Sequence, residues 1–90
     1  MAEPNVTKWE SILDMELLLH LWGKVEEDSL EGSLKNNNPT FLTPKGELCP
    51  SLDEAARKIQ ASKHHEVLEI KREGDAYYSR MYTYQDNQQI

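Results

Sequence analysis

The stretch from Ser51 to Tyr84 constrains the fold most, because a capped helix is followed there by the pattern of a β-hairpin. Ser51-Leu52-Asp53-Glu54 is a capping box, in which the Ser51 hydroxyl accepts from the Glu54 backbone N–H and the Glu54 carboxylate reaches back. The apolar residues that follow recur at helical spacing and predict a helix with one apolar side: Leu52, Ala55, Ala56 and Ile59.

The hairpin is predicted from the change of period after that helix. Residues 65–71 alternate between polar and apolar, Glu73-Gly74-Asp75 is typical of a turn, and residues 76–84 are rich in tyrosine. A two-residue Gly74-Asp75 loop pairs Leu68 with Met81, Ile70 with Ser79 and Glu69 with Arg80. A three-residue loop would shift this register and exchange the faces of one strand. We favour the two-residue loop because it matches aliphatic with aliphatic side chains and opposite charges across the strands.

This register assigns each hairpin side chain to one face of the sheet. The residues expected to face the core are Leu68, Ile70, Tyr77 and Met81. The residues expected to face outward are His65, Val67, Lys71, Tyr78, Tyr82 and Tyr84.

A long N-terminal helix over residues 8–25 is predicted from a second capping box, Thr7-Lys8-Trp9-Glu10. The segment is apolar most of the way round, with Leu13 and Leu17 on one side and Leu18 and Trp22 on the other. Such a helix is expected to be covered on two sides. The sheet can cover one side and another molecule the other, so helix 8–25 is also a candidate homodimer contact.

The remaining segments complete one α+β domain over residues 1–90. A short β element is expected where residues 40–43 and 47–49 flank the Pro44-Lys45-Gly46 turn. Residues 1–6 are expected to be a loose N-terminus, 29–40 a mobile loop and 85–90 a disordered tail. The predicted fold is therefore a long N-terminal helix, a short β element, a second helix and a C-terminal hairpin, whose strands form a small antiparallel sheet.

Charge and composition favour a protein partner. The chain has 16 acidic and 10 basic residues, a net charge of −6, which disfavours nucleic acid as a partner. A single cysteine, Cys49, excludes an intramolecular disulfide and a cysteine zinc cluster, and indicates a reducing, cytoplasmic location. No stretch has the apolar length of a membrane span, so no membrane association is expected.

No established catalytic motif occurs in the chain. We find no P-loop, GxGxxG, HExxH, GxSxG or EF-hand pattern. No metal site or cofactor is expected, because the histidines are His20 and the adjacent pair His64 and His65, and adjacent strand residues point to opposite faces. The expectation is a non-enzymatic protein-binding module, such as a regulator, inhibitor or adaptor.

Two surfaces are candidates for protein binding. One is the hairpin, where tyrosine offers a large rigid contact area with a polar tip, and the other is the apolar helix. The candidate residues are Tyr78, Tyr82, Tyr84 and Arg80 on the hairpin and Trp22 and Leu18 on the helix.

A nucleic-acid-binding alternative follows from the second helix. Ser51-Leu52-Asp53-Glu54-Ala55-Ala56 resembles the S-x-x-E-A-A start of helix-turn-helix segments in excisionase and MerR-like regulators. The resemblance covers about nine residues and implies a winged-helix-like domain with a wing tip at residues 71–74. The side chains that would contact phosphates are Arg57, Lys58, Lys63, Lys71 and Arg72.

Overall fold

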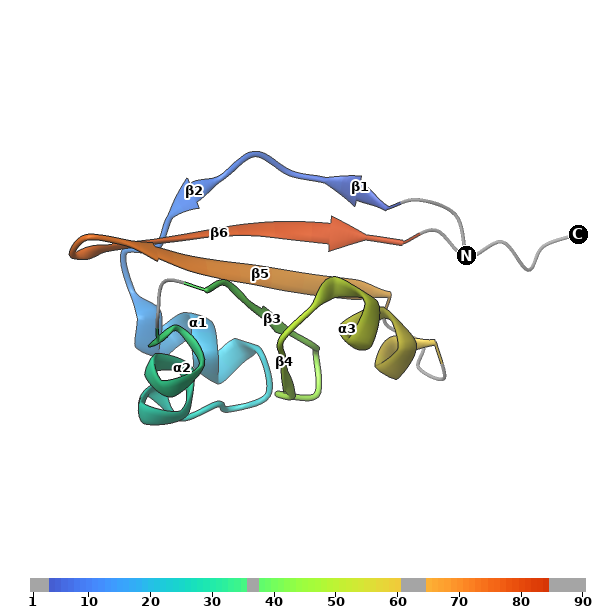
Figure 1. Ribbon diagram of the computed structural model, residues 1–90, viewed down its shortest axis with the longest axis horizontal. Coiled ribbons are helices and arrows are strands. Elements are labelled where there is room, and N and C mark those ends of the chain that lie inside the picture. The colour runs from blue at the N-terminus through green and yellow to red at the C-terminus, as the bar shows by residue number, and fades with distance from the viewer. Residues whose placement is uncertain (1–3, 36–37, 61–64, 85–90) are drawn as a thin grey trace, which may run out of the picture.

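The computed structural model describes residues 4–35, 38–60 and 65–84 as a small α+β fold (Figure 1). The strands are β1 (Asn5–Val6), β2 (Glu10–Ser11), β3 (Thr40–Leu42), β4 (Leu48–Cys49), β5 (Glu66–Glu73) and β6 (Ala76–Thr83). The helices are α1 (Met15–Leu21), α2 (Glu27–Ser33) and α3 (Leu52–Ile59). The six strands form one antiparallel sheet in the order β1-β6-β5-β3-β4, and β2 also pairs with β6.

The C-terminal hairpin has the predicted two-residue loop. Leu68 pairs with Met81, Ile70 with Ser79 and Glu69 with Arg80, so the predicted register is confirmed. β5 is the centre of the sheet, because β6 pairs with one edge and β3 with the other. The short β element is also confirmed, since Phe41 pairs with Cys49 across the turn that connects β3 and β4.

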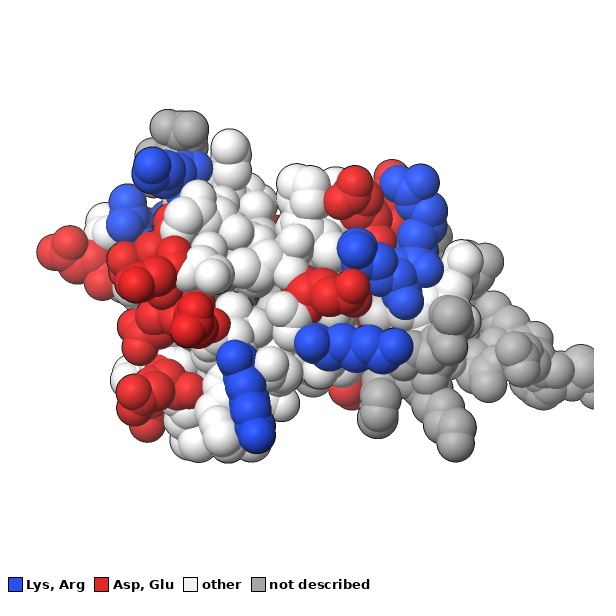
Figure 2. Space-filling view, turned by 90° about the horizontal axis from the view of Figure 1, so that it is seen from below, with Lys and Arg blue, Asp and Glu red and all other residues white. Residues whose placement is uncertain are grey.

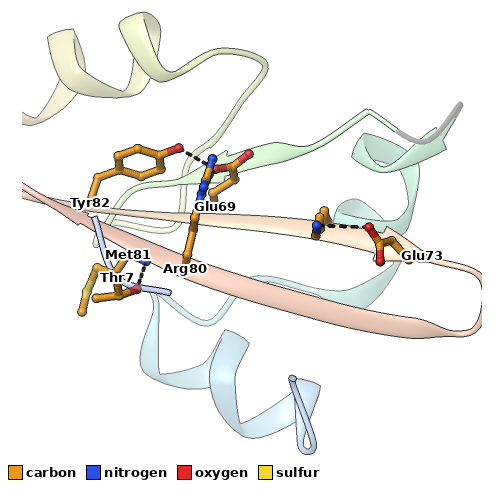
Figure 3. Close-up of polar contacts among 7 residues, drawn as sticks. Thr7, Glu69, Glu73, Arg80, Met81 and Tyr82 are labelled. Carbon is orange, nitrogen blue, oxygen red and sulfur yellow. Dashed lines mark hydrogen bonds and ion pairs between the residues drawn. The ribbon is translucent and has the colours of Figure 1, made fainter. Parts of the chain in front are cut away.

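The sheet is covered on both faces by helices, and each face has its own core. Figure 3 shows α3 and α1 on opposite sides of the hairpin. Alternate residues of β5 enter the two cores, with Val67 packed in the α3 core and Leu68 and Ile70 in the core under α1 and α2. Along the sheet, α1 and α2 lie toward the hairpin turn and α3 toward the other end (Figure 1).

The second helix forms as predicted. The Ser51 hydroxyl accepts a hydrogen bond of 3.2 Å from the Glu54 backbone N–H, which caps α3. Ala55 and Ile59 are buried, and Leu52 and Ala56 pack against the same core. Because alanine has a short side chain, α3 can approach the sheet closely.

The predicted long N-terminal helix is wrong, because α1 begins only at Met15. The Thr7 hydroxyl accepts from the Met81 N–H at 2.9 Å instead of capping a helix, and the Thr7 N–H donates to the Met81 carbonyl. β1 and β2 thus lie along the outer edge of β6, where tertiary hydrogen bonds replace those of a helix. Asp14 is the actual cap, since its carboxylate accepts from the Leu17 N–H at 3.0 Å.

Several predicted loops differ from the structure or lie outside the described residues. Residues 27–33, which overlap the expected loop at 29–40, form α2, and Leu30 packs into the core. Within the expected loose N-terminus, Asn5–Val6 forms β1. Residues 1–3, 36–37 and the expected tail at 85–90 lie outside the described residues.

Two glycines fix the end of α1 against the β3–β4 turn. Gly23 has a φ of 89° and ends the helix, and Gly46 has a φ of 86° in the turn. A Cβ on Gly23 would lie 2.5 Å from the Gly46 Cα and 2.7 Å from the Lys45 carbonyl carbon. The two backbones are therefore in direct contact, and only glycine satisfies both the space and the left-handed conformation there.

Candidate functional site

The most exposed apolar feature of the described residues is a row of three leucines, of which Leu17 and Leu21 lie on α1 and Leu13 lies just before its cap. Leu13, Leu17 and Leu21 are 95%, 54% and 70% exposed, and they follow one another at intervals of four residues. We call these three residues the leucine ridge. The opposite side of the helix faces the sheet, where Leu18 and Trp22 pack against the buried core. One apolar side of this segment is thus covered by the sheet and the other faces solvent.

A groove adjoins the leucine ridge and is formed by three hollows of about 240, 320 and 590 Å³. Leu18 lines the first and second hollows, and Trp22 lines the second and third. The sheet supplies further lining residues of the second hollow, which are Leu68, Ser79, Arg80 and Met81. Because neighbouring hollows share lining residues, they follow one another along α1, from Leu13 to the β3–β4 turn, and we call the three together the α1 groove.

The N-terminal end of this groove is acidic. Glu10 and Asp14 line the first hollow, and its described lining includes no Lys or Arg. At the other end, Lys45 and Glu66 contribute one charge of each sign. On the face seen in Figure 2, carboxylates gather over the end of the molecule that carries α1 and α2. The groove therefore combines apolar walls with negative charge at one end.

Leu18 and Trp22, two of the predicted site residues, line this groove while they also pack against the core. The leucine ridge itself is not among the predicted site residues. The signal was present in the spacing of four residues, but a helix starting at residue 8 would also have placed Trp9 and Ile12 on that side. In the structure Trp9 lies elsewhere, under Lys71 and Arg80.

The predicted tyrosine surface is divided between the two faces of the sheet. Tyr82 and Tyr84 are buried at 8% exposure, so the expectation that they face outward is wrong. They pack in the α3 core because α3 covers that face. Tyr78 is half-buried, and Tyr77 lies on the other face, where its O–H donates to the Glu31 carboxylate at 3.0 Å. The hairpin does not present its tyrosines as one exposed row.

Arg80, a further predicted site residue, lines the second hollow and is paired with Glu69. Its Nε donates to the Glu69 carboxylate at 2.8 Å, and the Tyr82 O–H donates to the same oxygen at 2.6 Å (Figure 3). The hydrogen bond from Arg80 to Glu69 raises the pKa of the guanidinium above its ordinary value. The guanidinium also lies 4.3 Å from the centre of the Trp9 ring, and Lys71 lies 4.1 Å from that centre. These contacts satisfy a buried carboxylate and anchor the N-terminal segment to the sheet.

The cations of the nucleic-acid alternative do not share one face. Arg57 and Lys58 are exposed on α3, and Lys58 pairs with Glu47 at 3.5 Å. Lys71 and Arg72 are neighbours in β5 and point to opposite faces of the sheet. Figure 2 shows Lys and Arg in separate groups on the face it displays, one of them over α3. Lys63, the fifth residue of that set, lies outside the described residues.

Comparison of the chain with protein-family models, curated proteins and solved structures gave no match. The site must therefore be interpreted from its own geometry. Among residues 4–35, 38–60 and 65–84, no three His, Cys, Asp or Glu side chains come together in a way that could hold a metal ion. Within the same ranges, no helix has the length and apolar character that crossing a bilayer requires.

Three buried groups predict a loss of stability at alkaline pH. Burial raises the pKa of Cys49, Tyr82 and Tyr84 above their ordinary values, and the hydrogen bond to Glu69 adds to the effect at Tyr82. The folded state therefore keeps these protons to higher pH than the unfolded chain does. Above the ordinary values of 9.0 for the thiol and 10.0 for the phenols, the unfolded state ionises first, so the free energy of unfolding should fall as pH rises.

Urea unfolding at a series of pH values from 8 upward measures this slope. Tyr82→Phe should flatten it above the ordinary tyrosine pKa, and Tyr82→Phe/Tyr84→Phe should flatten it further. The comparison uses the slope, because loss of the hydrogen bond to Glu69 also lowers stability at neutral pH by about 1–2 kcal/mol. An unchanged slope in the double variant would contradict the assignment to these tyrosines.

Proposed function

We propose that this chain is a non-enzymatic protein-binding module that docks its partner on the leucine ridge and the adjoining α1 groove. The observation that carries the proposal is the exposure of Leu13, Leu17 and Leu21, which together line the first of the three neighbouring hollows. Single exposed leucines are common on protein surfaces, but contiguous apolar patches mark interaction sites. Burying three leucines on a partner would supply the main hydrophobic contribution to binding.

The geometry supports the helix side of the molecule over the hairpin side. Two of the four tyrosines are inside the α3 core, and Arg80 is paired with Glu69. Using Tyr82 or Tyr84 for docking would require the core to open, and using Arg80 would compete with its ion pair to Glu69. The leucine ridge needs no such rearrangement, because its side chains already face solvent. A nucleic-acid function is not proposed, since the cations that it needs are distributed over different faces.

The test compares the wild-type chain with Leu13→Gln/Leu17→Gln/Leu21→Gln. This variant should unfold within a few degrees of the wild type, because each leucine is largely exposed. It should nevertheless lose the proteins that the wild type captures from a cell extract, as identified by mass spectrometry. The control is Tyr78→Gln, which changes the hairpin surface on the side where Trp9 lies. This variant should capture the same proteins as the wild type. Capture that survives the triple change, or that depends on Tyr78, would contradict the proposal.

A further inference from the structure

We infer that the partner element is an amphipathic α-helix with basic residues at the end that meets Glu10 and Asp14. This inference rests on the proposed function and names the kind of segment that the groove accepts. It is drawn from the shape of the groove, from the hydrogen bonding of the adjacent sheet edge and from the charge of the lining.

The shape favours a helix. Leu17 and Leu21 are spaced by four residues on the surface of α1, and side chains with this spacing fit between the corresponding side chains of a second helix at interaxial distances of about 8–10 Å. Within α1, Leu17 and Leu21 are one turn apart, about 6 Å at 1.5 Å per residue, and Leu13 extends the row beyond the N-cap Asp14. The partner would place apolar residues at i, i+3, i+4 and i+7 into the groove.

The sheet edge beside the groove argues against an extended peptide. A strand could be added to an open sheet edge by main-chain hydrogen bonds. Here β1 and β2 already pair with the outer edge of β6, and backbone hydrogen bonds from Thr7 to Met81 and from Ile12 to Tyr77 continue that pairing. The edge of β6 beside the groove is therefore already paired, which disfavours an added strand there and suits an element that satisfies its own backbone.

The charge of the lining favours a basic partner over a second copy of this chain. Glu10 and Asp14 line the first hollow, and Glu16 is exposed on the same helix. A second copy would bring the same carboxylates beside the same leucines and a further net charge of −6. Lys or Arg residues at one end of an amphipathic helix would instead complement Glu10 and Asp14 and speed association at low salt.

The experiment uses two fluorescein-labelled peptides of about four helical turns. They share one leucine stripe and differ only in flanking residues, which are lysine in one and glutamate in the other. Fluorescence anisotropy at low and high salt measures their binding to the full chain. The lysine peptide should bind saturably and more weakly at high salt, and the glutamate peptide should bind at least tenfold more weakly.

Three variants locate the binding. Leu17→Gln should weaken binding of the lysine peptide by about tenfold or more, since it removes the central leucine of the ridge. Glu10→Gln/Asp14→Asn should weaken binding of the lysine peptide several-fold and reduce the salt dependence of that binding. The helix should remain intact, because asparagine can still cap α1. The matched control, Asp53→Asn/Glu54→Gln, changes the net charge equally on α3, across the sheet, and should leave binding unchanged. Equal binding of both peptides, equal effects of the two charge variants or no effect of Leu17→Gln would overturn the inference.

Light scattering of the same proteins separates this inference from the function on which it rests. If the lysine peptide fails to bind, and the wild type forms a dimer that Leu17→Gln dissociates, the occupant is a second copy. The inference then fails and the docking function of the ridge stands. A different result would reject both the inference and the proposed function: the lysine peptide fails to bind, the chain is a monomer, and the triple leucine variant captures the same proteins as the wild type.

Discussion

Gly23→Ala is expected to lower the free energy of unfolding by about 2–5 kcal/mol, because two costs add at this position. A left-handed backbone is unfavourable for an L-residue, and Gly23 has a φ of 89°. The new Cβ would also lie 2.5 Å from the Gly46 Cα, so backbone rather than a flexible side chain must move. A chain of this length has a total stability of roughly 4–14 kcal/mol, so the variant should approach the limit of folding.

Gly32→Ala is the matched control for this prediction. Gly32 lies in α2, and a Cβ there meets nothing within 4 Å. Alanine is the better helix former by about 0.5–1 kcal/mol, so this variant should be slightly more stable than the wild type. Urea denaturation followed by circular dichroism measures both changes. Similar stabilities for the two variants would show that the Gly23–Gly46 contact does not constrain the fold as described.

Arg80→Met should cost about 2–3 kcal/mol, because it leaves the Glu69 carboxylate buried without its ion pair. The Glu69 side chain is only 8% exposed, and Arg80 Nε is 2.8 Å from it. Methionine keeps a long apolar chain that can still pack beside Trp9. The measured loss therefore reports the missing charge and hydrogen bond more than a missing contact area. Chemical denaturation gives the value.

The double variant Glu69→Leu/Arg80→Met tests the physical reason. Replacing a whole buried ion pair by apolar residues is often neutral or stabilising, whereas removing one partner is costly. The double variant should therefore regain at least half of the stability lost by Arg80→Met, although the Tyr82 O–H loses its acceptor. A double variant less stable than Arg80→Met would contradict this account.

The C-terminal half of the fold could be predicted because its signals are local. The capping serine and the apolar stripe define α3 within nine residues, and the Gly74-Asp75 turn fixes the hairpin register. Charge and size complementarity across the strands then distinguish between the two loop lengths. Glu69 opposite Arg80 supported the correct choice, and the structure shows that the two side chains form an ion pair.

The N-terminal half could not be predicted in the same way, because a distant segment determines its structure. Thr7-Lys8-Trp9-Glu10 has every local feature of a capping box, yet the Thr7 hydroxyl accepts from Met81, which is 74 residues away. The energy of a cap, about 1 kcal/mol, is smaller than that of several hydrogen bonds to β6 and the packing of Trp9.

The face of the hairpin that the sequence predicts to be exposed forms a second core in the structure. Val67, Tyr82 and Tyr84 are buried, since α3 folds over the end of that face. All four residues from Val67 to Ile70 are buried. Because Glu69 is polar, the sequence alternates as it would in a strand with one exposed face, so the pattern does not reveal that both faces are covered. The candidate site was predicted only in part, because Leu18 and Trp22 line the groove while the exposed leucines depend on where α1 begins.

The pairing of residues 5–12 with β6 also protects the molecule from its own copies. A bare eight-residue strand edge is a template for intermolecular β pairing, and soluble proteins cover or interrupt such edges. Here the cover is made of two short strands that contact little besides β6 and the cations above Trp9. Tags, fusions or proteolytic cuts placed within this segment would expose the edge of β6 and favour aggregation, so additions to the chain belong elsewhere.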